Sequence, residues 1–365
     1  MAIRLINVVG ARPNLMKIAP LMEAYGLDGS FDPVLVHTGQ HYDANMSALF
    51  FEQLGIPRPD VNLGVGSGSH AEQTAAIMQA FDRVLDADRA DAVVVVGDVN
   101  GTLACGLVAA KRKIPVVHIE AGLRSFDRGM PEEINRILTD SISDLLFCTE
   151  QSAVDNLVKE GARIERIHLV GNLMIDALMS HRQHAEASSI LEDLDLIAGG
   201  FTVVTLHRPS NVDRREVLSR ILDALEEIGR DGPIVLPAHP RTVQRLQEFG
   251  FHKRIADSPN FLLVEPLGYL EFLKLMANAA VVLTDSGGIQ EETTVLGVPC
   301  LTLRDNTERP VTVSMGTNQI VGTDPETILR AYRSVRSNPR EPSSPPYWDG
   351  EAASRIIPIL RAAFS

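Results

Sequence analysis

Short apolar runs alternate with amphipathic, helix-favouring stretches along the whole chain. In the first half, the runs typical of strands span residues 5–9, 34–37, 93–96, 116–119, 145–148 and 167–170. A second set spans residues 202–206, 234–237, 261–264, 281–284, 299–303 and 319–321. Continuously apolar strands separated by helices are typical of parallel sheets covered on both faces. The pattern predicts an α/β fold with two doubly wound, Rossmann-like parallel sheets.

A polar, helix-favouring stretch separates the two sets of strands. It runs from Leu173 to about Leu196 and ends at two glycines. A chain of 365 residues also suits two domains better than one. We therefore expect domains over residues 1–172 and 173–345 that face a cleft. Beyond a segment rich in proline and serine, a last helix over about 350–365 is expected to pack back on the first domain.

Composition narrows the class of protein. The formal charge is -13 and no basic stripe is present, which argues against a nucleic-acid partner. Cys105, Cys148 and Cys300 are far apart and lie in apolar stretches, as expected of reduced core residues. The first apolar run is too brief for a signal peptide, and no run reaches the length of a membrane span. We expect a cytoplasmic protein without membrane contact.

The segment over residues 281–292 carries the strongest local signal. An apolar strand leads into Ser286, Gly287 and Gly288 and then directly into a helix. Glycines let the backbone approach a ligand, and the free N–H groups of a helix start favour phosphate. Strand-Gly-helix corners are common in α/β folds, so this segment alone does not decide the matter. A polar loop with Arg304 and Arg309 follows the next strand, where arginines could reach a diphosphate.

Polar residues also follow several other strands. Arg12, Asp98, Glu120, His207 and His239 each come after a predicted strand end. Ligands of open α/β sheets bind at the carboxyl ends of the strands, so these side chains are candidates for one site. Carboxylates from one domain with imidazoles and a phosphate-binding turn from the other would suit acid/base chemistry on a phosphorylated ligand.

Structural interpretations compete with these roles. Asp98 could cap the helix that begins near Thr102. Glu132 and Glu133 follow Pro131 at a helix start, where acidic residues are stabilising for dipole reasons alone. A histidine at a strand end is more often structural than catalytic, and a lysine such as Lys17 is common on surfaces. Glu120 is the exception, because it ends a very apolar strand and leads into a loop instead of a helix.

Metal and dinucleotide sites are not expected. Asp86 and Asp88, like Asp193 and Asp195, have the spacing of metal-binding carboxylates but lie outside strand ends. His37 and His41 bracket a turn, so they make a poor zinc site. The first strand is followed by Gly-Ala-Arg-Pro, which lacks the dinucleotide fingerprint. The sequence thus predicts neither a metal nor a cofactor.

Taken together, these residues resemble the non-hydrolysing UDP-N-acetylglucosamine 2-epimerases, which have the two-domain GT-B fold. The matching segments are residues 10–17, 38–41, 97–98, 118–124, 131–136, 171–172, 207–208, 285–292 and 307–310. The resemblance implies reversible inversion at C2 of UDP-N-acetylglucosamine, by elimination of UDP and its re-addition to a glycal. It also implies a homodimer as the assembly.

The resemblance assigns roles to individual residues. Asp98, Glu120 and Glu132 match the acid/base carboxylates, and His207 matches the histidine that steadies the departing diphosphate. Which carboxylate removes the C2 proton stays open. The positions expected to bind the substrate are Arg12, Lys17, His239, Phe272, Ser286, Gly287, Gly288, Glu292 and Arg309. The N–H groups over residues 286–288 would hold phosphate, and Glu292 would bind ribose hydroxyls.

Departures from the family pattern keep alternatives open. Tyr42 and Pro209 replace arginines near the pocket through which some members are activated, and Leu267 replaces a glutamine that contacts uracil. The rival substrates are other UDP-N-acyl sugars, such as a diacetamido uronate. The rival reactions are hydrolytic release of N-acetylmannosamine and UDP, and glycosyl transfer by a GT-B enzyme. A nucleotide-sugar sensor without turnover is the non-enzymatic alternative.

Overall fold

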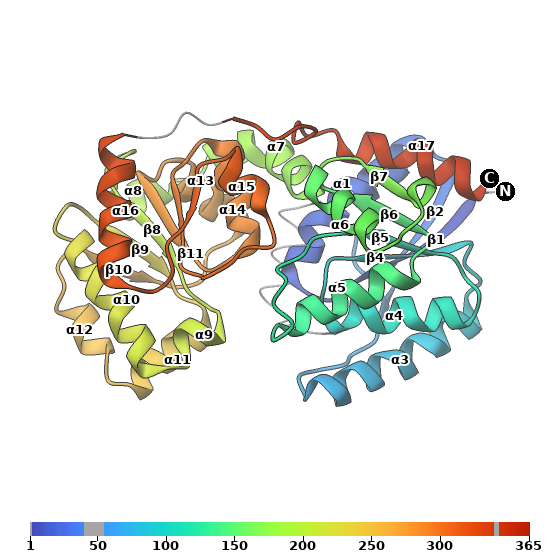
Figure 1. The fold of residues 1–365 in the computed structure, drawn as a ribbon, viewed down its shortest axis with the longest axis horizontal. Coiled ribbons are helices and arrows are strands. Elements are labelled where there is room, and N and C mark those ends of the chain that lie inside the picture. Colours follow the sequence, from blue (N-terminus) through green and yellow to red (C-terminus); the bar gives the residue numbers. More distant parts are fainter. Residues whose placement is uncertain (1, 40–54, 339–342) are drawn as a thin grey trace. The chain divides into compact units, whose positions relative to one another are not determined.

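The apolar runs form two parallel sheets, each in its own unit of the chain (Figure 1). This computed structural model describes residues 2–39, 55–338 and 343–365. Unit 1 comprises Met1–Ser180 and Pro346–Ser365, and unit 2 comprises His181–Pro345. Every strand pair in both sheets is parallel. The predicted α/β fold with two doubly wound sheets is confirmed.

The sheet of unit 1 has the order β3-β2-β1-β4-β5-β6-β7. Its strands are β1 (Ile3–Val9), β2 (Phe31–His37), β3 (Val61–Asn62), β4 (Ala92–Val96), β5 (Val116–Ile119), β6 (Leu145–Cys148) and β7 (Ile167–Leu169). The helices are α1 (Arg12–Asp28), α3 (His70–Ala87), α4 (Asn100–Lys111), α5 (Pro131–Ile142), α6 (Gln151–Lys159) and α17 (Ala352–Phe364), with a 3-10 turn at Ile164–Arg166. Helix α7 (Leu173–Glu186) begins in unit 1 and ends in unit 2. Strand order reverses between β1 and β4, which is where doubly wound sheets bind ligands.

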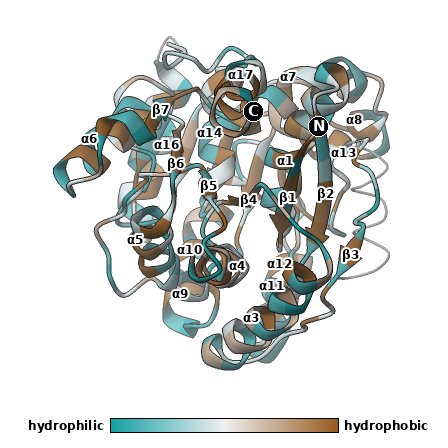
Figure 2. Ribbon diagram, turned by 90° about the vertical axis from the view of Figure 1, so that its right-hand side faces the viewer, coloured by the Kyte–Doolittle hydropathy of each residue, from teal (hydrophilic) through white to brown (hydrophobic). Residues whose placement is uncertain are grey.

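Helices cover both faces of this sheet. Helix α4 packs between α3 and α5 on one face, and α17 lies against α1 on the other (Figure 1). Strand β4 is buried and hydrophobic along its whole length because both of its faces are covered, and β1 and β2 are partly hydrophobic (Figure 2). Cys105 and Cys148 are fully buried in this unit, as expected of core residues.

The C-terminal segment is fastened to unit 1 by polar contacts. The Trp348 indole N–H donates to the Thr149 carbonyl at 2.9 Å. The Asp176 carboxylate accepts the first two N–H groups of α17, from Ala352 at 3.1 Å and Ala353 at 2.8 Å. At Gly171 the segment passes so close that an added Cβ would lie 2.1 Å from the Tyr347 carbonyl oxygen. Only glycine allows this approach.

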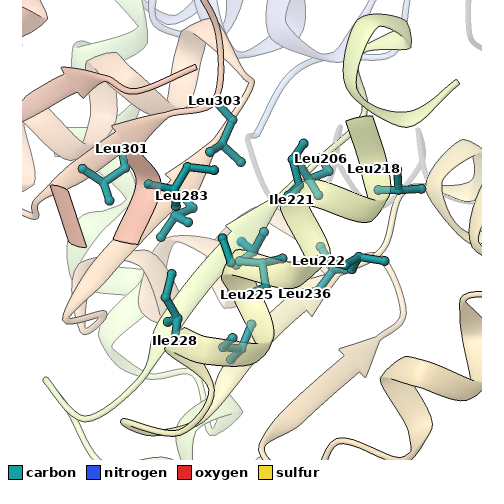
Figure 3. Close-up of a cluster of buried hydrophobic side chains, with 14 of the residues drawn as sticks. Leu206, Leu218, Ile221, Leu222, Leu225, Ile228, Leu236, Leu283, Leu301 and Leu303 are labelled. Carbon is teal, nitrogen blue, oxygen red and sulfur yellow. The ribbon is translucent and has the colours of Figure 1, made fainter. Parts of the chain in front are cut away.

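Unit 2 repeats the architecture with the order β10-β9-β8-β11-β12-β13. The strands are β8 (Thr202–Thr205), β9 (Ile234–Pro237), β10 (Phe261–Val264), β11 (Val281–Thr284), β12 (Cys300–Thr302) and β13 (Asn318–Ile320). The helices are α8 (Ile190–Asp193), α9 (Pro209–Val212), α10 (Arg215–Ile228), α11 (Pro240–Glu248), α12 (His252–Ala256), α13 (Tyr269–Ala277), α14 (Gly287–Leu296), α15 (Pro310–Ser314) and α16 (Pro325–Ser337). Figure 3 shows the core under α10, where Leu218, Ile221 and Leu225 meet strand residues such as Leu236 and Leu283.

The helix-favouring stretch from Leu173 to about Leu196 contains two helices, α7 and α8, which are separated by a turn at residues 187–189. Strand β3 was missed, since it has only two residues, a half-exposed valine and an exposed asparagine, which give no apolar run. In the described parts of the chain, no helix combines the length and apolarity that a membrane crossing requires.

Candidate functional site

Glu120 follows β5 in unit 1 and has an unusual backbone. Its φ is +73°, in the left-handed region that non-glycine residues rarely occupy. The residue is only 4% exposed, and its carboxylate forms an ion pair with the equally buried Lys17 of α1. Both side chains line a small cavity with Phe147, Thr149 and Asn172. A strained, buried carboxylate beside a cavity is typical of functional sites.

Asp98 follows β4, the neighbouring strand. It is not the N-cap of α4, because that helix begins at Asn100 with Val99 as its cap. Its carboxylate instead pairs with the buried Arg136 of α5, Oδ2 to Nη1 at 2.8 Å, while its own side chain is 25% exposed. The adjacent Asn135 donates to the Asp98 carbonyl at 2.9 Å. Helix α5 therefore fixes both the backbone and the side chain of Asp98.

Glu132 and Glu133 have different surroundings although they are neighbours in α5. Glu133 is buried and accepts the N–H groups of Ser125 and Phe126, each at 2.9 Å. It also pairs with Arg136 at 3.1 Å, so it holds the loop before the helix. Glu132 is half-exposed and makes no hydrogen bond or ion pair within the described residues. Its carboxylate remains available to a ligand.

The turn between β11 and α14 is the predicted anion site of unit 2. The Ser286 N–H donates to Thr284 Oγ1 at 2.9 Å, and its expected contact with phosphate stays a prediction. The next N–H groups, of Gly287 and Gly288, lie in the first turn of α14 and have no intrahelical acceptor. An added Cβ at residue 287 would lie 2.6 Å from Arg309 Nη1. The guanidinium packs against the turn, so any larger side chain here would displace it.

Arg309 lies between two buried carboxylates. Its Nε is 2.8 Å from Glu291 Oε1, and its Nη1 is 2.7 Å from Glu308 Oε1. Glu308 also pairs with Arg304 at 2.7 Å. Burial would raise the pKa of Glu308, but Arg309 and Arg304 outweigh it and hold that pKa well below its ordinary value. The cluster brings guanidinium groups to the N-terminus of α14.

His207 follows β8 and is oriented by Asp285, which follows β11. Its Nδ1 lies 2.9 Å from Asp285 Oδ1, and the imidazole is 43% exposed while Asp285 is buried. Asp285 also accepts the N–H groups of His207 and Arg208 at 3.1 and 3.0 Å. Burial would raise the pKa of Asp285, but these bonds and the His207 charge hold it below its ordinary value. The contact directs Nε2 of His207 away from Asp285.

Glu292 lies in the first half of α14 and is almost completely buried. The Tyr269 hydroxyl donates to its Oε1 at 3.1 Å. Burial raises the pKa of Glu292 to about 8, against the effect of the Tyr269 hydrogen bond and with a further contribution from Glu291. Without ligand, the side chain is therefore a neutral acid at pH 7.

The remaining candidates are less enclosed. His239 is an exposed N-cap whose Nδ1 accepts the Arg241 N–H at 3.2 Å. Phe272 is half-buried on α13. Arg12 is the first residue of α1, but its side chain lies outside the described residues, as do His41 and Tyr42. Pro209 begins α9.

The acidic pairs set aside in the sequence have other partners. Asp86 pairs with Arg112 at 2.7 Å, and Asp88 pairs with Arg4 at 2.6 Å. Asp193 accepts the Ser189 hydroxyl at 2.9 Å. His37 is buried and accepts the Gly39 N–H at 2.9 Å. These contacts account for the side chains as parts of the fold.

Sequence reasoning missed the residues that hold the candidates. Asp285 directly follows β11 and lies inside a motif, yet it was not singled out, and Arg136 lies inside a motif but within α5, away from any strand end. Asp140 stands outside every motif, and only its position one turn beyond Arg136 on the same face of α5 could have suggested it. Each of these residues is buried and contacts the polypeptide instead of facing a cavity.

Comparison with known proteins gives consistent matches over nearly the whole chain. The family model for UDP-N-acetylglucosamine 2-epimerase matches residues 24–361. The chain is 43% identical over 362 residues to the UDP-N-acetylglucosamine 2-epimerase of Methanocaldococcus jannaschii, covering 98% of both. It is 40% identical over 360 residues to the UDP-2,3-diacetamido-2,3-dideoxy-D-glucuronate 2-epimerase of Pseudomonas aeruginosa, covering 98% of this chain and 99% of the relative. The crystal structure of the Methanocaldococcus jannaschii enzyme with UDP-GlcNAc and UDP superposes with a TM-score of 0.93, covering 99% of this chain and all of the other.

Proposed function

The chain belongs to the UDP-N-acetylglucosamine 2-epimerase family, and we propose that it interconverts UDP-N-acetylglucosamine and UDP-N-acetylmannosamine. The observation that carries this proposal is Glu120, a buried carboxylate with a left-handed backbone that faces a cavity beside Lys17. A non-hydrolysing route needs no cofactor, since UDP leaves from C1 and adds back to the glycal.

The acid/base work falls to the carboxylates of unit 1. A C2 proton beside an acetal carbon is scarcely acidic, so it leaves only as the C1–O bond to UDP breaks. Inversion then requires a proton to be removed from one face of C2 and returned to the other. Asp98, Glu120 and Glu132 supply groups for both steps. Of these, Glu132 has the fewest contacts with the polypeptide.

Binding of UDP falls to unit 2. The Gly287 and Gly288 N–H groups, the positive end of α14 and Arg309 suit a diphosphate. His207 stabilises the charge that develops on the departing phosphate, with Asp285 setting its orientation. The neutral Glu292 acid can donate to or accept from a ribose hydroxyl. Phe272 and His239 complete the proposed binding residues, with Arg12 and Lys17 from unit 1.

The test is turnover of UDP-N-acetylglucosamine in D2O, without added metal or cofactor, followed by proton NMR. We expect UDP-N-acetylmannosamine with deuterium at C2. Free UDP with N-acetylmannosamine would instead establish hydrolysis. Absence of any change with this sugar, across substrate concentrations and with UDP added, would rule the proposal out.

A second candidate substrate follows from the Pseudomonas aeruginosa relative, whose identity to this chain is almost as high. A uronate carries a charged C6, which requires a cation that the hydroxymethyl group of N-acetylglucosamine does not. Comparing kcat/KM for the two UDP sugars under the same conditions decides between them. A ratio that favours the diacetamido uronate would reassign the substrate.

We further propose that the chain acts as a homodimer in the cytoplasm. Its cysteines are free and buried in the described residues, which suits a reducing compartment. Ile134 and Leu138 are exposed apolar residues on one face of α5. Light scattering of the purified protein measures its molar mass in solution, and a monomer mass at assay concentration would contradict the homodimer. Cell fractionation tests the cytoplasmic location.

A further inference from the structure

Asp140 is a buried carboxylate on α5 that contacts three points around Glu120. Its Oδ1 lies 2.6 Å from His118 Nδ1, and its Oδ2 accepts the Gly122 N–H at 3.1 Å. Its Oδ2 also pairs with Arg124 Nη2 at 2.7 Å. The contacts thus fall two residues before Glu120, two residues after it and farther along the same loop.

The same network reaches Asp98 through His118. The second ring nitrogen, Nε2, lies 2.8 Å from the carbonyl oxygen of Gly97, the residue before Asp98. Burial opposes ionisation of Asp140, but His118 and Arg124 outweigh burial and hold its pKa below the ordinary value. Both ring nitrogens of the fully buried His118 are thus engaged, one with Asp140 and the other with the Gly97 carbonyl.

The position of this network matters because Glu120 needs support. A left-handed φ at a non-glycine residue persists only where the surroundings hold it. The N–H groups of Glu120 and Ala121 both donate to the Phe147 carbonyl, at 3.1 and 2.9 Å, which fixes one side of the turn. Asp140 fixes the other side through His118 and Gly122. Helix α5 also carries Arg136 and Asn135, which hold Asp98.

We propose that Asp140 and His118 are positioning residues that hold the carboxylates of Asp98 and Glu120 in register for the two proton transfers. This inference rests on the proposed epimerase function. Neither residue is a catalytic residue, since Asp140 is 5% and His118 0% exposed. The proposal predicts that breaking the network lowers the rate of the chemical step with little loss of UDP binding, because Asp140 and His118 are not among the proposed UDP contacts, most of which belong to unit 2.

The test uses the full-length protein and three substitutions. Asp140→Asn keeps the size of the side chain and removes its charge. His118→Asn keeps a donor near the position of Nδ1, toward Asp140, and loses the bond to Gly97. His118→Gln keeps a donor near the position of Nε2, toward Gly97, and loses the hydrogen bond to Asp140. The matched control is Glu160→Gln, which removes the exposed partner of Arg124 and leaves Asp140 untouched.

We expect each of the three variants to lower kcat by about 10- to 100-fold, as a misplacement near 1 Å does, with little change in KM. The double variant Asp140→Asn/His118→Asn should be no slower than the slower single variant, because the two residues act as a unit. The control should retain the kcat of the unmodified protein. Circular dichroism and calorimetric UDP binding identify the variants that are folded. If Asp140→Asn does not fold, the two histidine variants still test the positioning role.

Other outcomes would overturn the proposal. These are folded histidine variants with undiminished kcat, a loss confined to KM, or single losses that multiply in the double variant. The unmodified protein is assayed first, in D2O with UDP-N-acetylglucosamine. If it does not turn over, the proposed function fails; if it turns over and the variants match it, only the positioning role fails.

Discussion

The two units share a sheet order but reverse the roles of buried charge. In unit 1 buried cations hold carboxylates: Lys17 pairs with Glu120, and Arg136 pairs with Asp98. In unit 2 buried carboxylates hold nitrogen-bearing side chains: Asp285 contacts the His207 imidazole, and Glu291 and Glu308 pair with the Arg309 guanidinium. The strands are alike, so the difference lies in the loops that follow them.

This contrast shows how one fold supports two kinds of chemistry. The parallel sheets supply strand ends next to a switch point, and the residues placed there decide whether a unit suits proton transfer or anion binding. In each unit the functional group is partnered by a buried group of opposite charge. Removing one partner of a buried pair leaves an uncompensated charge, which costs about 3–5 kcal/mol. Substitutions should therefore affect the two units in different ways.

The largest effect is expected for Glu120→Gln in unit 1. Glutamine has the same shape but cannot take the proton, and it leaves Lys17 without an anionic partner. We expect kcat to fall by about 10²- to 10⁴-fold, the usual contribution of a general acid or base, while UDP still binds. Turnover by NMR and UDP binding by calorimetry measure the two quantities. A variant that keeps more than about a tenth of the kcat would contradict the role; Glu160→Gln serves again as the control.

The next effect, in unit 2, is expected for Arg309→Lys. A lysine ammonium can reach one carboxylate at a time, whereas the guanidinium bridges Glu291 and Glu308 and still faces the α14 turn. We expect UDP to bind about 100-fold more weakly, from the lost bidentate contact and the displaced carboxylates. Arg330→Lys, at an exposed position of α16, is the matched control. Equal UDP affinity in Arg309→Lys and in the control would remove Arg309 from the binding site.

The sequence was informative about strands and strand ends, and much less about partners. Apolar runs located nearly every strand, and asking which polar residues follow them found Asp98, Glu120 and His207. The pairing of Lys17 with Glu120 joins a residue of α1 to one that follows β5, and no local pattern encodes it. Likewise, Glu132 and Glu133 look alike in sequence. The helix turns one toward the Ser125 loop and leaves the other half-exposed, which depends on tertiary packing.

A smaller effect, again in unit 2, concerns Glu292 and pH. In the folded protein the Glu292 carboxyl keeps its proton up to about pH 8, whereas in the unfolded chain it loses the proton near its ordinary pKa of 4.5. The unfolding free energy of the unmodified protein should therefore fall as pH rises from about 4.5 to 8 and level off above that. Glu292→Gln carries no such proton, so its stability relative to the unmodified protein should rise over the same window, by about 1.4 kcal/mol per pH unit.

Urea unfolding between pH 5 and pH 9 measures this difference. The exposed Glu326 on α16 provides the control, because Glu326→Gln should show no such trend. A constant difference between Glu292→Gln and the unmodified protein across the window would mean that Glu292 is ionised in the folded state. Its part in ribose binding would then be that of an acceptor alone.

The smallest effect is expected for Gly287→Ala, which separates backbone geometry from charge. A methyl group at this position would lie 2.6 Å from Arg309 Nη1 and 2.9 Å from Glu308 Oε1, so the guanidinium must move although no charge changes. We expect about a tenfold loss in UDP affinity, or about 1.4 kcal/mol. Gly26→Ala is the matched control, since nothing lies within 4 Å of a Cβ added there in α1. If Gly287→Ala bound UDP as tightly as the control, the close packing of Arg309 against the α14 turn would not contribute to binding, and the cationic role of unit 2 would rest on the helix N-terminus and His207.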